Sequence, residues 1–304
     1  MNTNIFSSII DFLNSLFGAK PQTIPQTPSV QPQTIPSTVI AATSPPPPNS
    51  GATDTTSTIP DRSLSFVTGS GWVAANLNTS GAAREANILA EFKKGNMPDF
   101  LRNFIEVTVS NGADSITYKV MADYLCIGSD YDYVRVPMNP HTAQAIADQY
   151  DCTLITRKMT NDIWKQSPNK LEPRPWGPPY NADMEKTHRI GTHSNTIKKQ
   201  LVGKDPFALT SGHKKDVVLT NKLSPHNPNK RVAIYGWIQL NGKPIQDLNT
   251  SSHDDKYADY SHGVRLVDNY AVVNGQPMRM RDVFTHPAYS KLVSDEGPLT
   301  FLSY

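Results

Sequence analysis

Histidine, aspartate and tyrosine side chains gather in one stretch of the chain, residues 211–267. Within it, His253, Asp259 and His262 follow one another closely enough to converge on a single point. Neutral imidazole and carboxylate are ligands that zinc accepts, and three protein ligands leave a fourth position for water. The stretch therefore predicts either a metal site, with zinc as the candidate ion, or a group of acid–base catalysts.

The segment around His253 resembles the SxHxxGxAxD signature of the zinc D-Ala-D-Ala peptidases. Ser251, His253 and Ala258 match that signature. However, Lys256 stands where the signature has glycine, and Asp259 comes one position early. On a strand, a shift of one residue would turn the carboxylate to the opposite face. Because two positions of the signature differ, the resemblance gives only partial support for a zinc site.

Further polar side chains in the same stretch are candidates for catalysis and substrate binding. We expect His213 to face the same site as His262, as a ligand or an acid–base group. Lys215 and Arg265 are expected to hold a carboxylate of the substrate, with Tyr257 beside them. The alternative for His213 and Lys215 is a turn and a solvated charged face, which is what most runs of charge are.

Nucleophilic catalysis has less support in the sequence. Ser261 precedes His262, but neighbouring side chains on a strand point to opposite faces, so a nucleophilic Ser261 would need another histidine such as His213 as its base. Cys126 and Cys152 lie in apolar runs, which is typical of buried free thiols rather than of stabilised thiolates.

Residues 1–19 predict a short amphipathic helix, and an apolar face of this kind can dock into a groove of a partner protein. A cleaved signal peptide and a membrane-surface helix are the alternatives, although no basic residue precedes the apolar part and Asp11 interrupts it. The partner would be a virion or export component. The expected docking residues are Ile5, Ile9, Leu13, Leu16 and Phe17.

Residues 20–60 are rich in Pro, Thr and Ser and contain no charged side chain between Lys20 and Asp54. Proline fixes φ and removes hydrogen-bond donors, so this segment predicts an extended linker. We expect residues 61–304 to form the globular domain. No apolar run is long enough to predict a transmembrane helix.

In residues 61–304, helical and strand patterns interleave without a regular βαβ period. Asn111-Gly112 and Asn274-Gly275 are hairpin signals. The pattern predicts a single α+β domain with a mainly antiparallel sheet and peripheral helices. The main helices are expected at residues 80–94, 98–104, 139–150, 157–166 and 182–202, and the strands of the polar stretch at 216–220, 231–238 and 263–267.

The charge balance bears on the kind of partner. The chain has 29 Lys and Arg against 27 Asp and Glu, a formal net charge of +2. Proteins that bind the phosphate backbone usually have a clear basic excess, so we expect no nucleic-acid partner.

The segments GHKKDVVLTNKL, RVAIYGW and YADYSHGVRLV resemble an uncharacterised family of bacterial secreted and phage-encoded proteins. The resemblance runs from about Arg84 onwards and implies a self-contained domain that works in a virion or outside the cell. The resemblance implies no activity, but a docking helix and a charge-free arm ahead of a domain with a His/Asp/Tyr cluster lead us to expect a hydrolase of the bacterial cell wall, acting on peptidoglycan. The alternative is a non-enzymatic virion structural or receptor-binding protein that is anchored through its N-terminal peptide.

Overall fold

The computed structural model describes residues 59–304 except 178–180 and 225. The expected docking helix, residues 1–19, and nearly all of the expected linker lie outside the described residues. Contacts group residues 54–304 as one unit. Ile59 is only 7% exposed and belongs to the core, so the folded domain begins just before the expected boundary at residue 61.

One sheet is antiparallel throughout and contains both expected hairpins. Its strands run in the order β1-β2-β13-β14, and β5 also pairs with β13. Gly112, Asn274 and Gly275 have positive φ at the two hairpin turns, which is why these turns use Asn and Gly. The strands are β1 (Ile105–Asn111), β2 (Asp114–Val120), β5 (Cys152–Thr153), β13 (Val267–Val273) and β14 (Gln276–Arg279).

The second sheet contains most of the strands of the polar stretch. Its order is β11-β10-β9-β12, with β6 also paired to β9. The pairs β11–β10 and β10–β9 are antiparallel, whereas the short strands β12 and β6 run parallel to β9. The strands are β6 (Ile155–Thr156), β9 (Lys215–Leu219), β10 (Ile234–Ile238), β11 (Pro244–Asn249) and β12 (His262–Gly263).

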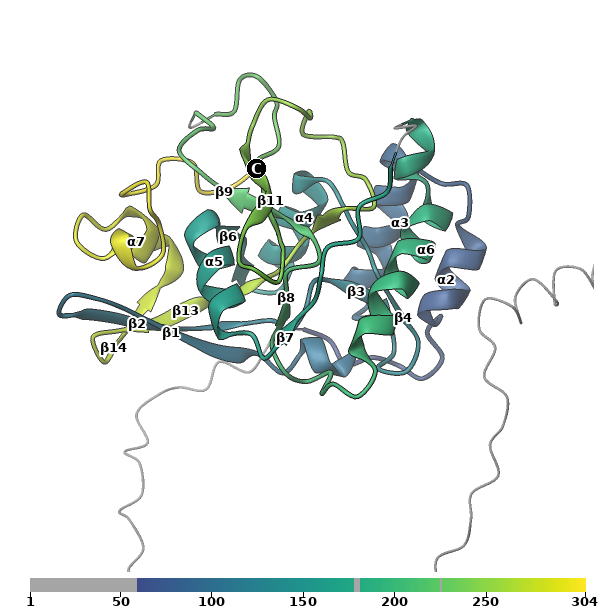
Figure 1. Cartoon of the computed structure of the whole chain (residues 1–304), viewed down its shortest axis with the longest axis horizontal. Helices are drawn as coiled ribbons and strands as arrows, with labels where there is room; N and C mark the ends of the chain where they lie inside the picture. Colours follow the sequence, from purple (N-terminus) through teal and green to yellow (C-terminus); the bar gives the residue numbers. More distant parts are fainter. Residues whose placement is uncertain (1–58, 178–180, 225) are drawn as a thin grey trace, which may run out of the picture. The chain divides into compact units, whose positions relative to one another are not determined.

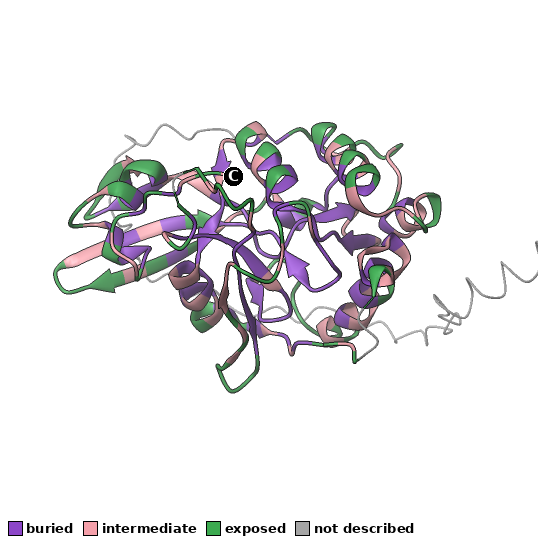
Figure 2. Cartoon of the chain, turned by 90° about the horizontal axis from the view of Figure 1, so that it is seen from above, coloured by how far each residue is buried: buried purple, intermediate pink, exposed green. Residues whose placement is uncertain are grey.

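The core lies around β9 and β10, which are almost entirely buried. Figure 2 shows buried strands at the centre of the domain. Helix α5 (Arg157–Gln166) contacts strands of both sheets, and its buried Met159 and Ile163 form an apolar stripe that faces the core. Thr156 begins this helix by accepting a hydrogen bond from the Met159 amide. Helix α5 thereby joins the two sheets into one core.

The remaining helices lie at the periphery, where Figure 2 shows exposed outer surfaces. Helices α2 and α6 contact each other, as do α3 and α4 (Figure 1). In the part of the chain that the structure describes, no helix has both the length and the apolarity to cross a membrane. The helices are α2 (Gly69–Ala75), α3 (Gly81–Lys93), α4 (Pro140–Gln149), α6 (Thr187–Lys198) and α7 (Met280–Thr285), with 3-10 turns η1 (Asp99–Leu101) and η4 (Ser290–Leu292).

Two short strand pairs complete the domain. Strands β3 and β4 are antiparallel, and β7 and β8 are parallel. Together with both sheets they confirm an α+β domain whose pairing is mainly antiparallel. The strands are β3 (Cys126–Gly128), β4 (Tyr133–Arg135), β7 (Asn169–Lys170) and β8 (Thr210–Ser211).

Three expected elements differ from the structure. The helix expected at 182–202 is interrupted at Lys186, whose ψ of 146° is extended, and it divides into η2 (Ala182–Glu185), α6 and η3 (Lys199–Leu201). The helix expected at 98–104 is only η1. The strand expected at 263–267 is divided because the chain leaves the second sheet after β12 and enters the first at β13.

Candidate functional site

A cleft of about 600 Å³ opens beside the second sheet. Its walls come from the Pro-rich loop, from η2, from β9 and β10, and from the segment that leads into β12. Half of the lining is aromatic or acidic, so the cleft can contact both apolar and polar groups of a ligand. The lining side chains used below are Trp176, Glu185, Lys215, Trp237, His253, Tyr257, Asp259, Tyr260 and Ser261.

Three side chains that the sequence proposes as metal ligands meet at this cleft. One ligand atom each from His253, Asp259 and His262 lies within 4.8 Å of the others. His253 and Asp259 line the cleft, and His262 lies directly behind them on β12 with no exposed surface. The structure thus brings together the three residues in the expected combination.

Asp259 reaches this position because residues 255–261 form turns and irregular backbone, not a strand. Side chains alternate between two faces only on an extended strand, so the early position of Asp259 does not turn its carboxylate away from the histidines. Its Oδ1 accepts hydrogen bonds from the Ser261 amide at 2.8 Å and the Ser261 hydroxyl at 2.6 Å, and its Oδ2 accepts one from the Tyr257 hydroxyl at 3.1 Å. These contacts fix the orientation of the carboxylate.

The protonation states of the cluster suit a cation. Burial alone would raise the pKa of Asp259, but His262, Ser261 and Lys215 hold that pKa well below its usual range. Burial lowers the pKa of His262, and it lowers the pKa of His253 as well. An ionised carboxylate beside two neutral imidazoles is the protonation pattern that a divalent metal requires.

His262 supplies a direct test of whether these residues fit a metal. Neither of its ring nitrogens has a hydrogen-bond partner among the described residues, although the side chain is fully buried. A buried polar group without a partner is costly, and a bound ion is one of its recognised explanations. Ligand atoms around a tetrahedral zinc lie about 3.4 Å apart, so the three side chains would close in slightly on binding.

Strand β9 separates two environments on its opposite faces. Lys215 lines the cleft, while the next residue, Asp216, lines an internal cavity. His262 pairs directly with Lys215 across the β12–β9 ladder, and paired residues share a face of the sheet. The register therefore places His262 on the cleft side together with Lys215.

Trp237 forms part of the cleft wall through an unusual backbone conformation. Its φ is +55°, next to Gly236 at +111°, where the register between β10 and β11 shifts. Such bulges re-aim side chains near functional sites, and a positive φ is uncommon for a bulky residue. The Lys215 Nζ lies 4.7 Å from the centre of the Trp237 ring, so this indole positions the lysine.

Trp176 also lines the cleft, but most of its ring is engaged by protein. It stacks on Tyr260 with ring centres 4.1 Å apart, and the Arg189 guanidinium lies 5.4 Å from its ring centre. Its amide donates a hydrogen bond to the Tyr260 hydroxyl at 2.8 Å. Trp176 therefore fixes the Pro-rich loop against the cleft wall.

His213 lies apart from the metal cluster, contrary to our expectation that it shares a site with His262. It is fully buried, with Nε2 3.2 Å from Asp123 Oδ1. Asp123 also pairs with the buried Arg135 at 2.5 Å. Burial lowers the pKa of His213 to about 4 despite the attraction of Asp123, so the imidazole is neutral near pH 7. We assign His213 to the core.

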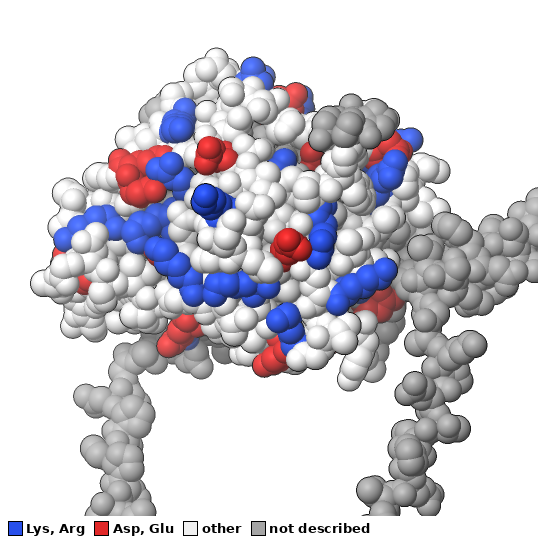
Figure 3. Space-filling model, viewed as in Figure 1, with Lys and Arg blue, Asp and Glu red and all other residues white. Residues whose placement is uncertain are grey.

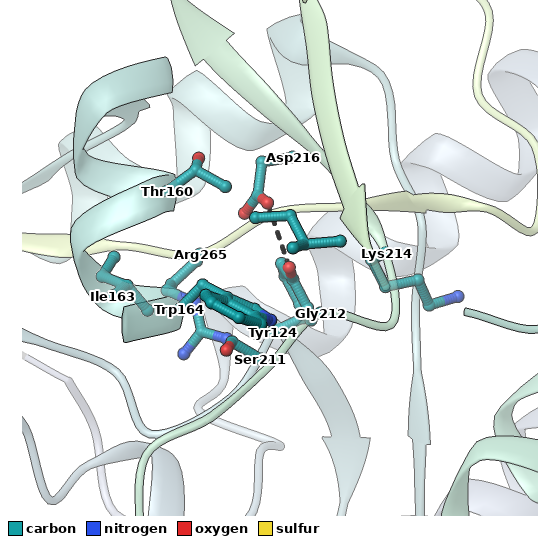
Figure 4. Close-up of a pocket in the computed structure, with 10 residues that line it drawn as sticks. Tyr124, Thr160, Ile163, Trp164, Ser211, Gly212, Lys214, Asp216 and Arg265 are labelled. Carbon is teal, nitrogen blue, oxygen red and sulfur yellow. Dashed lines mark hydrogen bonds between the residues drawn. The ribbon is translucent and has the colours of Figure 1, made fainter. Parts of the chain in front are cut away.

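Arg265 is likewise not placed in the cleft, so it cannot hold a substrate carboxylate there. It donates hydrogen bonds to the backbone carbonyls of Met121 and Thr210 and stacks 4.5 Å from the ring centre of Tyr124. It lines an internal cavity of about 10 Å³ together with Asp216 (Figure 4). The Arg265 guanidinium therefore joins two backbone segments of the core.

The other candidate residues are Tyr257, Lys215, Ser261 and the two cysteines. Tyr257 and Lys215 line the cleft as expected. Ser261 donates a hydrogen bond from its hydroxyl to Asp259 and thus orients a ligand instead of pairing with His262. Cys126 and Cys152 are buried free thiols, and burial raises the pKa of both well above the usual range.

Sequence reasoning missed Glu185 and Arg84. Glu185 lines the cleft from η2, and Arg84 on α3 is fully buried behind it. Both are far from the polar stretch in sequence and match no spacing motif. The charged segment that contains Glu185 reads as one face of a helix, and only the three-dimensional fold brings it to Asp259.

Comparison with known proteins identifies no relative of the chain: no family model, no curated protein and no solved structure matches it. The resemblance to bacterial secreted and phage-encoded proteins stays a prediction from the sequence. Function must therefore be argued from the site.

Proposed function

We propose that the chain is a zinc-dependent hydrolase of the bacterial cell wall, with peptidoglycan as its substrate. The observation that supports this most is the convergence of His253, Asp259 and His262 within 4.8 Å at the wall of a cleft of about 600 Å³. Both nitrogens of the buried His262 lack partners there. Zinc, when bound, activates water and polarises a carbonyl group.

The chain's own residues would orient the substrate. Lys215 is placed in the cleft to pair with an anionic group, such as the carboxylate of a peptidoglycan stem peptide. Trp237 and Tyr257 also line the cleft and offer apolar surface to a substrate. A band of Lys and Arg side chains, with Asp and Glu scattered around it, is visible in Figure 3 and suits an anionic envelope polymer.

The extracellular setting in this proposal comes from the sequence, because an amphipathic segment and a Pro-rich linker precede the domain. A virion-bound or exported protein would use such an arm to place its domain near the wall. The competing hypothesis, a non-enzymatic virion component, needs no metal and no activity.

The test combines metal analysis with digestion of purified sacculi by the full chain. We expect about one zinc per chain, and loss of digestion after chelation that added zinc restores. His253→Ala should lower both zinc content and rate at least tenfold, because it removes one of three ligands from a half-exposed position. His226→Ala, at an exposed histidine outside the cleft, is the matched control.

Full digestion by His253→Ala would contradict the proposal. Zinc binding without any digestion of sacculi would support the virion-component hypothesis over a cell-wall hydrolase.

A further inference from the structure

Glu185 is the second carboxylate of the cleft, and its contacts differ from those of Asp259. Both oxygens of Asp259 accept hydrogen bonds from Ser261 or Tyr257. The Glu185 carboxylate makes no hydrogen bond or ion pair with any residue that the structure describes. Glu185 therefore has a carboxylate that is available to a water molecule or a substrate in the cleft.

The surroundings of Glu185 favour proton uptake at this position. Burial raises the pKa of Glu185, and the nearby negative charges of Asp259 and Asp254 act in the same direction, while Arg84 opposes them. A general base works best when its pKa approaches the working pH. Two carboxylates whose pKa values are displaced in opposite directions are typical of groups with separate roles.

Arg84 links this carboxylate to the ligand cluster through the backbone. Its guanidinium donates one hydrogen bond to the carbonyl of Glu185 and another, of 2.9 Å, to the carbonyl of Ala258. Ala258 directly precedes the ligand Asp259. Glu85 balances the buried charge of Arg84 at 2.9 Å. Arg84 thus fixes the separation between η2 and the ligand-bearing turn.

We propose that the cleft hydrolyses amide bonds, with Glu185 as the proton-transfer group and Arg84 as its positioning residue. This inference rests on the proposed function and adds the class of bond. Water adds across the C–N bond: its oxygen bonds to the acyl carbon, and Glu185 takes one proton from it. Glu185 then passes that proton to the nitrogen, the C–N bond breaks, and a carboxylic acid and an amine result.

Hydrolysis of the glycan strand is the less suitable reaction for this cleft. Glycosidases use two carboxyl groups that both act on the sugar, one as acid and the other as base or nucleophile. In the cleft, Asp259 is bound by Ser261 and Tyr257 and faces two histidines, which leaves Glu185 alone for the reaction. One available carboxylate next to a three-ligand cluster suits acyl transfer to water.

The experiment digests purified sacculi with the full chain and measures new amino groups and new reducing ends in parallel. We expect amino groups only. Glu185→Gln keeps the size of the side chain but cannot accept the proton, so kcat should fall about 10²- to 10⁴-fold. Zinc content should stay equal to that of the wild type, and KM should change less than threefold.

Glu172→Gln is the matched control, because Glu172 is a half-exposed carboxylate that pairs with Arg174 outside the cleft. Arg84→Lys keeps the charge opposite Glu85 but cannot reach both carbonyls, so it should lower kcat with KM unchanged.

Each outcome is decisive. A Glu185→Gln variant with wild-type kcat, or reducing ends in place of amino groups, would overturn this inference and leave a metal-dependent hydrolase intact. Release of neither product by the wild type would overturn the inference and the proposed function together.

Discussion

At the scale of single residues, the chain buries more charge than its composition suggests. Arg84, Arg135, Lys214 and Arg265 are each at most 1% exposed. The pairing of Asp123 with Arg135 and His213 shows how this is tolerated, since buried charges need partners and hydrogen bonds. A charged side chain in the polar stretch, such as Lys214 or Arg265, is therefore not a functional residue by its charge alone.

Lys214 illustrates the same point beside the cleft. Burial lowers its pKa to about 7, and its Nζ lies 3.2 Å from His193 Nδ1 while it also donates to the Tyr260 carbonyl. His193 Nε2 contacts the Arg174 carbonyl at 3.2 Å, so Nδ1 is the acceptor for Lys214. This network supports the aromatic wall from behind without entering the cleft.

Asp216 gives a pH-dependent prediction at this scale. Burial raises its pKa to about 7, although Arg265 and a 3.0 Å hydrogen bond from the Tyr124 hydroxyl oppose the shift (Figure 4). The folded state therefore retains this proton between about pH 4 and pH 7, where the unfolded chain releases it. The stability that it contributes is complete below about pH 4 and is lost as the pH rises to about 7.

Asp216→Asn removes this titration, because the amide stays neutral and still accepts the Tyr124 hydrogen bond. The unfolding free energy of the variant minus that of the wild type should increase by about 2 to 4 kcal/mol between pH 4 and pH 8. Urea unfolding at several pH values measures the difference. Asp99→Asn, at a side chain that is 68% exposed, is the control substitution. If the difference in unfolding free energy between Asp216→Asn and the wild type does not change with pH, the raised pKa of Asp216 is contradicted.

At the scale of elements, the close approach of β12 to β9 places His262. Gly263 pairs with Asp216, and a Cβ at position 263 would come within 2.7 Å of both the Lys214 Cβ and the Tyr124 ring. The Tyr124 ring is held between His213 and Arg265, so it has little room to move. Only glycine lets β12 lie this close to the strand that bears Lys215.

Gly263→Ala should therefore destabilise the domain by about 1 to 3 kcal/mol and weaken zinc binding, because it displaces the strand that bears His262. Thermal unfolding and zinc titration of the same preparations measure both effects. Gly177→Ala is the control, since no atom lies within 4 Å of a Cβ added there. If the two variants have equal stability and equal zinc affinity, β12 is not fixed by this contact.

The elements also show what the sequence could predict. The hairpin at Asn111-Gly112 and the helix expected at 157–166, which Thr156 caps, appear where expected because turn and cap chemistry is local. The strand expected at 263–267 is divided between two sheets, since its pairing depends on residues far away in the sequence. Local patterns specify element type, whereas distant partners decide where a strand ends.

At the scale of the whole molecule, the ligand cluster was predictable and its surroundings were not. His253, Asp259 and His262 lie within one short segment, so spacing alone could nominate them. Glu185 and Arg84 come from other elements, and only tertiary packing brings them to the cleft. His213 and Arg265 are near in sequence but face the core: His213 lies in a bend before β9 and Arg265 follows β12, so neither stands on a strand whose alternation could have predicted its side.

The central claim is that His253, Asp259 and His262 bind a zinc ion. The most direct measurement is an anomalous difference map, recorded on both sides of the zinc absorption edge, from crystals of the full chain grown with zinc. We expect a peak about 2.0 to 2.2 Å from one atom of each of the three side chains. A crystal in which zinc binds elsewhere, with no peak between these residues, would contradict the account.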